Sequence, residues 1–266
     1  MKYLSLPLES FARLALLAGV WLAVSGAGRA VCLDSQAGWT KVWHEVKQPD
    51  YKLVINNIGS GAVLVGKSRF AFPNLAFFAG DKSCSMSSPL HGAGAWTSVT
   101  GTVAEADGAV TIAIEGLIED VKVRQTYRAE PGRVVWDWLA EVIDPTPDMR
   151  WFRFQGLFMD CAGYPFAVRL ADGGLRRGVL DPAAFRELGQ ARAIEVFTPK
   201  GAATVEWLES SGVTIRPNQN TQQPHIPLTY LCHGAGRAGA NSSPPLMPGE
   251  QVHIKMQITI KKETKP

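Results

Sequence analysis

Histidine and carboxylate residues are the side chains of this sequence that could carry acid–base chemistry. His91 lies in a glycine-rich loop just before Trp96, and an imidazole with a near-neutral pKa can act as an acid. Asp137 and Glu141 lie four residues apart on one face of an expected strand, and Asp160 ends the next strand. Carboxylates on one sheet face could form the pair that cleaves a glycosidic bond. The alternative is a solvated face whose acids pair with arginines.

A second set of side chains could hold a ligand. Residues 151–159 place Trp151, Arg153 and Gln155 on one side of an expected strand, which combines aromatic, cationic and amide groups. Together with Arg124 on a neighbouring strand, they are our candidate ligand-binding residues. Tryptophan can stack on the apolar face of a sugar, but in a β-sandwich it more often packs in the core. This choice applies to Trp136, Trp138, Trp151 and Trp207.

Metal, cofactor and nucleic-acid functions find little support in the sequence. His225, Cys232 and His233 form no tight set of three ligands, and the chain has no C-x-x-C pair. We therefore expect no metal and no cofactor. The formal net charge is +3, and basic residues alternate with acidic ones instead of clustering. A nucleic-acid partner is not expected from this pattern.

The elements that position these residues are strands. Residues 110–160 alternate apolar and polar side chains, which predicts a meander of four antiparallel strands. Residues 134–143 are partly apolar on both faces and so predict a central strand. Asp107-Gly108 predicts a tight hairpin turn, because both residues tolerate positive φ. In residues 252–260 the even-numbered apolar positions are expected to face inward, and His253 and Lys255 outward.

Other segments give weaker predictions. Residues 70–78 form an aromatic strand that contains Pro73, which indicates an edge strand or a bulge. Asp181 and Pro182 predict the start of one short helix that ends at Gly189. Residues 217–248 are rich in Pro, Asn, Ser and Gly, and predict a long surface excursion around one apolar island, residues 226–231.

The first thirty residues have the pattern of a secretory signal peptide. Lys2 and Arg13 precede an apolar run over residues 14–24, and small residues follow it, with cleavage expected after Ala27 or Ala30. The run is well short of the ~20 residues that span a bilayer as a helix. An uncleaved anchor and a lipidated Cys32 are the alternatives. We expect a secreted or periplasmic protein with no integral membrane span in the mature chain, and one domain over residues 31–266.

The four cysteines of an exported chain permit up to two disulfides. The pairings expected are Cys161 with Cys232, or Cys32 with Cys84, and buried thiols are the alternative.

Three stretches resemble the galactose mutarotase-like family, whose sandwich is shared by sugar epimerases, glycoside hydrolases and polysaccharide lyases. Residues 89–96 (PLHGAGAW) are similar to its histidine-glycine segment, and residues 124–142 (RQTYRAEPGRVVWDWLAEV) to its paired central strands. Residues 245–256 (PLMPGEQVHIKM) are similar to its closing turn and last strand. The resemblance implies an all-β fold, a large two-sheet antiparallel β-sandwich of the supersandwich type.

Family epimerases open a sugar ring with a carboxylate base and a histidine acid. The resemblance assigns the acid to His91, and Glu206 and Glu209 are the candidates for the family's late glutamate. It implies an exported carbohydrate-interacting protein that binds a mono- or polysaccharide, as a divergent epimerase or a relative of polysaccharide-degrading enzymes. A non-catalytic module that binds a glycan or a protein is the alternative.

Overall fold

The computed structural model describes residues 31–32, 42–56, 59–79, 82–85, 98–118, 120–144, 149–181, 191–210, 213–217, 225–232 and 247–262. For strands β1, β6, β11, β16 and β17 it describes the backbone alone. The expected signal peptide, His91 and residues 182–190 of the expected helix lie outside the described residues. Within the described part, no helix is long and apolar enough to cross a membrane.

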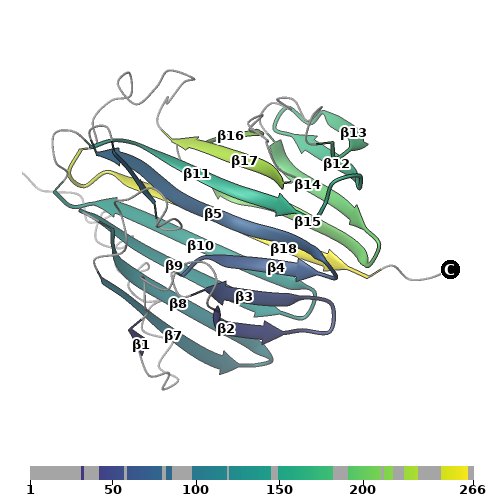
Figure 1. Cartoon of the computed structure of the whole chain (residues 1–266), viewed down its shortest axis with the longest axis horizontal. Helices are drawn as coiled ribbons and strands as arrows, with labels where there is room; N and C mark the ends of the chain where they lie inside the picture. The colour runs from purple at the N-terminus through teal and green to yellow at the C-terminus, as the bar shows by residue number, and fades with distance from the viewer. Residues whose placement is uncertain are drawn as a thin grey trace, which may run out of the picture.

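The described residues form two antiparallel sheets that face each other as a sandwich (Figure 1). The ten-stranded sheet has the order β1 (Val31–Cys32), β7 (Ser98–Ala106), β8 (Ala109–Ile118), β9 (Val121–Glu130), β10 (Arg133–Val142), β18 (Gln251–Lys261), β15 (Gly201–Ser210), β14 (Ala191–Thr198), β12 (Pro165–Leu170) and β13 (Leu175–Val179). The eight-stranded sheet has the order β16 (Val213–Pro217), β17 (His225–Cys232), β11 (Met149–Met159), β5 (Ser68–Ala79), β4 (Gly61–Val65), β3 (Lys52–Asn56) and β2 (Val42–Lys47), with β6 (Lys82–Ser85) beside β5. The expected all-β, two-sheet antiparallel sandwich is confirmed.

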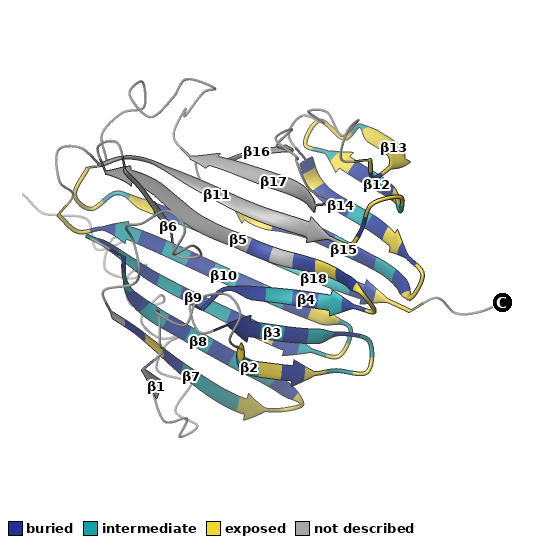
Figure 2. Cartoon of the chain, viewed as in Figure 1, coloured by how far each residue is buried: buried dark blue, intermediate teal, exposed yellow. Residues whose placement is uncertain are grey.

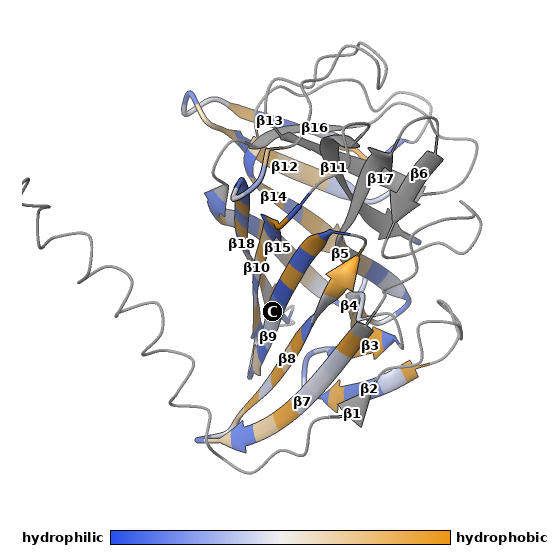
Figure 3. Ribbon diagram, turned by 90° about the vertical axis from the view of Figure 1, so that its left-hand side faces the viewer, coloured by the Kyte–Doolittle hydropathy of each residue, from blue (hydrophilic) through white to orange (hydrophobic). Residues whose placement is uncertain are grey.

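The period-two pattern of the sequence produces the core. Along β8, β9, β10 and β18 buried side chains alternate with half-exposed or exposed ones, with one interruption at Val110 and Thr111 (Figure 2). Figure 3 shows hydrophobic and hydrophilic residues alternating along the strands of this sheet. Burial of one face against the other sheet supplies most of the hydrophobic stabilisation of such a sandwich.

Aromatic side chains from both sheets meet in this core. Phe72 on β5 lies 5.3 Å from the ring of Tyr127 on β9 and 5.5 Å from that of Trp136 on β10, between ring centroids. Trp136 and Trp138 have no exposed surface, and Trp207 is 6% exposed. These three tryptophans therefore pack in the core and are not placed to stack on a sugar.

A buried polar network also joins the two sheets. Gln125 Nε2 donates a hydrogen bond to the carbonyl of Gly59 (2.7 Å), which lies in the β3–β4 turn of the other sheet. Gln125 Oε1 accepts from Trp136 Nε1 (3.1 Å), and the hydroxyl of Tyr127 lies 3.0 Å from both Gln125 Oε1 and Gly59 O. Burial raises the pKa of Tyr127, so its hydroxyl keeps its proton as a donor.

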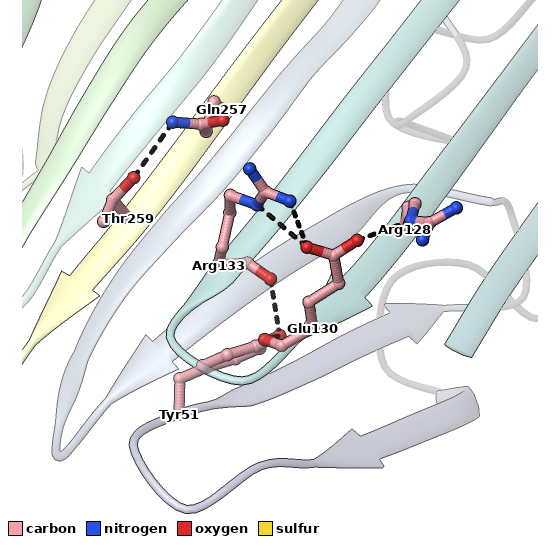
Figure 4. A network of polar contacts seen from close by, with 6 residues as sticks. All are labelled: Tyr51, Arg128, Glu130, Arg133, Gln257 and Thr259. Atoms are coloured by element: carbon pink, nitrogen blue, oxygen red, sulfur yellow. Dashed lines mark hydrogen bonds and ion pairs between the residues drawn. The ribbon is translucent and has the colours of Figure 1, made fainter. Parts of the chain in front are cut away.

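A second polar contact fixes the hairpin β2–β3 to the β9–β10 turn (Figure 4). The Tyr51 hydroxyl lies 2.7 Å from the carbonyl of Glu130 and 2.9 Å from that of Arg133. The Glu130 carboxylate contacts Arg128 Nε at 2.6 Å and the Arg133 guanidinium, and these contacts hold its pKa below the usual range. The cation–carboxylate cluster lies at the surface, where such contacts stabilise weakly.

The structure confirms several expected elements and corrects others. Asp107 (φ 51°) and Gly108 (φ 75°) form the predicted hairpin turn. The aromatic strand is the bulged alternative, because β5 pairs with β4 and β11, and its register with β11 shifts across Pro73. The four-strand meander is wrong in its last member: β11 does not pair with β10 but crosses to the other sheet between β17 and β5.

The prediction for residues 217–248 is corrected at its apolar island, which belongs to β17 and pairs with β11 and β16, whereas residues 218–224 and 233–246 lie outside the described residues. The same register separates two cysteines that the sequence allowed to pair. Met159 lies opposite His225, so Cys161 lies near the first residue of β17 whereas Cys232 is its last. The two cysteines are therefore about 20 Å apart at roughly 3.3 Å per residue. Cys161 is a buried thiol, so this disulfide is not formed. The pairing of Cys32 with Cys84 stays a prediction.

Candidate functional site

The candidate ligand-binding residues of β11 lie in the middle of the eight-stranded sheet. Arg153 is opposite Ala76 on β5 and Leu231 on β17, and Gln155 is opposite Asn74 and Thr229. Trp151 lies on the same strand. The structure thus places Arg153 and Gln155 at paired positions of the sheet and Trp151 within an irregularity of the pairing with β5, and the ligand-binding role of the three residues stays a prediction.

The other candidates lie on the ten-stranded sheet, on the face turned away from the eight-stranded sheet, which we call the outer face. Arg124 Nε lies 3.8 Å from Glu115 Oε1, a carboxylate that Lys122 also contacts at 2.7 Å. Glu206 Oε1 lies 3.8 Å from Arg169 Nη2. Because they lie on the outer face, Arg124, Glu206 and Glu209 are not brought together with the residues of β11.

On the outer face the structure brings Glu209 into a cluster with three residues from β10 and β18. We call Asp137, Glu209, His253 and Lys255 the His253 cluster. The imidazole of His253 lies between two carboxylates, with Nε2 2.8 Å from Asp137 Oδ1 and Nδ1 3.1 Å from Glu209 Oε2. Lys255 Nζ contacts the second oxygen of Asp137 at 3.1 Å. Three adjacent strands, β10, β18 and β15, therefore supply one polar cluster.

Strand register explains how β10 and β18 meet at the cluster. Asp137 lies directly opposite Lys255, and His253 lies two residues further along β18. Side chains two residues apart on a strand project from the same face. Asp137 can therefore contact both His253 and Lys255 from one position.

A β-bulge in β15 supplies the third member of the cluster. Trp207 is opposite Met256, but Glu209 is opposite Lys255, so Leu208 is the extra residue. Strict alternation would turn residue 209 to the same buried side as Trp207. The bulge instead leaves Glu209 and Leu208 exposed, Leu208 at 45%. A bulge that re-aims a side chain in this way is a common feature of functional sites.

The electrostatics of the cluster favour its charged form. Burial raises the pKa of Asp137, but hydrogen bonds and positive charge from His253 and Lys255 outweigh this and lower it overall. The hydrogen bond to Asp137 is the main cause that raises the pKa of His253, with Glu209 adding to the effect. Both shifts favour the charged forms of the Asp137–His253 pair.

The cluster does not have the geometry of a metal site. Its two carboxylates contact different nitrogens of one imidazole ring, so their oxygens do not converge on one point. Among the described residues, no group of three or more His, Cys, Asp or Glu side chains could hold a metal ion.

The carboxylate pair considered from the sequence is not assembled. Asp137 and Glu141 both lie on β10, and four residues of a strand span about 13 Å, more than the roughly 5 to 9.5 Å between paired glycosidase carboxylates. Asp160 lies beyond the end of β11, exposed and at φ 58°, where its backbone carbonyl accepts from Ser68 Oγ at 3.4 Å.

Sequence reasoning placed His253 and Lys255 on an outward face but gave them no function. The signal was present, because an outward histidine and lysine on the last strand stand two residues apart. Their partner Glu209 could not be assigned to them from sequence, because the bulge at Leu208 and the pairing of β15 with β18 join residues far apart in the chain.

The sequence matches no model of a protein family and no curated protein. Among solved structures, an α-N-acetylgalactosaminidase from Bifidobacterium bifidum, in complex with GalNAc, is similar with a TM-score of 0.53 and 10% identity over 84% of this chain. A galactose mutarotase-like protein from Lactobacillus casei has a TM-score of 0.48 and 12% identity, over 82% of this chain and 99% of its own. A protein from Escherichia coli K12 described as a putative aldose 1-epimerase has a TM-score of 0.44 and 9% identity, over 88% of this chain and 100% of its own.

These similarities concern the fold. Of the three, the galactosaminidase alone exceeds a TM-score of 0.5, and the chain spans 36% of that protein's length. At 10% identity the likeness shows a shared architecture and no shared chemistry. The fold that the sequence resemblance implied, a two-sheet antiparallel β-sandwich, is confirmed, and the solved galactosaminidase structure shares this architecture over part of its length.

Proposed function

We propose that the protein is exported and binds a saccharide at the His253 cluster, on the outer face of the ten-stranded sheet. The observation that carries the proposal is the convergence of Asp137, Glu209, His253 and Lys255 from three adjacent strands on this face. The fold shared with carbohydrate-related proteins supports the same class of ligand.

The chemistry of the cluster suits hydroxyl groups. Carboxylate oxygens accept hydrogen bonds from sugar hydroxyls, and an ammonium has three N–H donors, of which the contact with Asp137 uses one. Hydrogen bonds to charged groups are the strong ones. Leu208, exposed beside Glu209, offers an apolar contact for the C–H face of a sugar ring. The four side chains already hold one another in place, so a ligand would meet a preorganised surface.

The geometry favours binding over ring opening. An acid and a base that act on a sugar must each reach a different atom of the ring. Glu209 and His253 instead contact each other at 3.1 Å, and both imidazole nitrogens lie against carboxylates. We therefore propose a non-catalytic saccharide-binding role for this face. An epimerase activity would need His91, which lies outside the described residues.

Binding to a panel of immobilised mono- and oligosaccharides tests the proposal, with GalNAc as the first probe because the galactosaminidase structure contains it. Glu209→Gln should weaken binding about tenfold or more, the effect of removing one charged acceptor. Glu105→Gln is the matched control, because Glu105 is exposed on β7 at a distance from the cluster. Equal affinity of both variants for the bound sugar would contradict the assignment of the site.

Anomer interconversion, followed by proton resonance, separates the catalytic alternative from the binding one. We expect the protein to leave the rates for galactose, glucose and GalNAc unchanged. A rate enhancement that His91→Ala abolishes would instead support the divergent epimerase. Export is tested separately, by locating the protein in the cell envelope or medium and determining the mature N-terminus, expected after Ala27 or Ala30.

A further inference from the structure

The strand β13 ends the ten-stranded sheet and presents an unusual edge. It pairs on one side with β12, and no strand among the described residues pairs with its other side. All five of its residues are exposed, which Figure 2 shows as a continuous exposed colour along β13. Leu175 and Val179 are 53% and 57% exposed although they are apolar. A strand with one unpaired side can accept another strand.

The hydrogen bonds around the hairpin show which backbone groups face the open side. Leu170 N donates to Gly174 O, and Leu180 N donates to Tyr164 O. Bonded positions alternate along an antiparallel pair, so residues 176 and 178 direct their N–H and C=O groups toward β12. Residues 175, 177 and 179 direct theirs away from the sheet. Within the part of the chain that the structure describes, the backbone groups of these three residues are therefore available to a partner strand.

The same three residues also share the outer face of the sheet. Gly178 is on the same face of the sheet as the buried ring of Phe166, since a Cβ added to Gly178 would lie 3.0 Å from that ring. Leu175, Arg177 and Val179 consequently project from the opposite face. The edge thus presents an arginine between two exposed apolar side chains.

The charge of the hairpin identifies the kind of strand that fits. Residues 165–179 contain Arg169, Arg176 and Arg177 against one acid, Asp172. A second copy of β13, paired antiparallel about its centre, would place Arg177 opposite Arg177, and like charges in that position are destabilising. The β2 edge of the other sheet differs, because Glu45 there contacts Lys47 and Lys52. The basic edge of β13 is complementary to an acidic partner.

We propose that β13 binds an extended, acidic segment of a partner protein by strand addition. Backbone hydrogen bonds to residues 175, 177 and 179 supply affinity, and side-chain contacts supply specificity, as in other strand-addition complexes. The bound segment places apolar residues opposite Leu175 and Val179 and acidic residues opposite Arg176 and Arg177. Its pattern is apolar, any residue, acidic, acidic, apolar. The proposal does not depend on saccharide binding.

Fluorescence anisotropy with a capped, labelled peptide of sequence Thr-Val-Thr-Glu-Glu-Val-Thr tests this proposal in the absence of sugar. The peptide should bind the wild-type protein, and a matched peptide with lysines in place of the glutamates should not. Arg177→Glu should reverse this preference. Equal binding of both peptides would overturn the proposal.

A proline variant distinguishes strand addition from simple charge attraction. Val179→Pro removes an outward-facing N–H without breaking a bond to β12, so it should weaken binding about three- to tenfold more than Val179→Ala. Leu175→Pro provides the same test if Val179→Pro does not fold. Equal affinity of the proline and alanine variants would show that only charge is recognised, and would refute strand addition. A wild-type dimer in sedimentation that Arg177→Glu abolishes would also refute it, in favour of self-association.

Discussion

The buried amide of Gln125 should be worth more to this fold than any polar side chain of the outer face. The variant Gln125→Leu keeps a side chain of similar size but removes the 2.7 Å hydrogen bond to Gly59 O and the oxygen that accepts from the Trp136 indole N–H. The lost bond costs about 1 kcal/mol, and a buried donor left without its acceptor costs about 1–3 kcal/mol. We expect a loss of about 2–4 kcal/mol in the free energy of unfolding, because Gln125 is 2% exposed and water cannot replace the amide.

Urea denaturation at neutral pH measures this loss, and Gln257→Leu is the matched control. Gln257 lies on β18, and its substitution removes the same amide group from a half-exposed position on the outer face, where the amide donates to Thr259 Oγ1 at 3.1 Å (Figure 4). Gln257→Leu should change the free energy of unfolding by no more than about 0.5 kcal/mol. Similar losses for the two variants would refute the view that the buried network joins the sheets.

A double-mutant cycle with Tyr127→Phe extends the test. The Tyr127 hydroxyl lies 3.0 Å from both Gly59 O and Gln125 Oε1, so the two side chains share one carbonyl. Tyr127→Phe alone should cost about 1 kcal/mol. The cycle should give a coupling of at least about 0.5 kcal/mol, as contacting residues do. Strict additivity would contradict a shared network.

Three further outcomes are expected. The pKa of His253 is raised, mainly by its hydrogen bond to Asp137. The stability that His253 contributes is therefore fully present below about pH 6.5 and is lost as the pH rises through the folded-state pKa. The difference in free energy of unfolding between wild type and His253→Gln should shrink with rising pH, and a constant difference would contradict this. Gly61→Ala should cost about 3 kcal/mol, because its Cβ would lie 2.4 Å from a buried tyrosine ring, whereas Gly108→Ala, with nothing within 4 Å and only a positive φ, should cost about 1 kcal/mol; equal losses in thermal melts would count against the packing described. Burial raises the pKa of the Cys161 thiol to about 12, so mass spectrometry should find it unmodified by iodoacetamide until the chain unfolds, and rapid labelling of the native protein would contradict its burial.

The sequence predicts most of the strands of the ten-stranded sheet, because that sheet has one buried face and therefore a clear period of two. The turn at Asp107-Gly108 and the inward positions of β18 follow from local chemistry alone. The same periodicity cannot tell which sheet a strand joins. The connection after β10 contains Pro145 and Pro147, and β11 crosses to the second sheet, where long-range pairing decides its neighbours.

The candidate site was less predictable than the fold. Glu209 was selected through its resemblance to a family glutamate, but the structure places it beside His253 and Asp137 on the outer face of one sheet. This arrangement depends on a one-residue bulge at Leu208, and a bulge has no signature in alternating apolar and polar residues. The edge strand β13 also escaped notice, because its exposed LRRGV sequence has no buried face to produce a pattern.

A crystal of the protein soaked with a mixture of GalNAc, galactose and short oligosaccharides tests the central claim most directly. The account predicts a sugar whose hydroxyls lie within hydrogen-bonding distance of Glu209 and Lys255, with a ring face against Leu208. A sugar bound instead beside Arg153 and Gln155 of β11, with the outer face of the ten-stranded sheet bare, would contradict it.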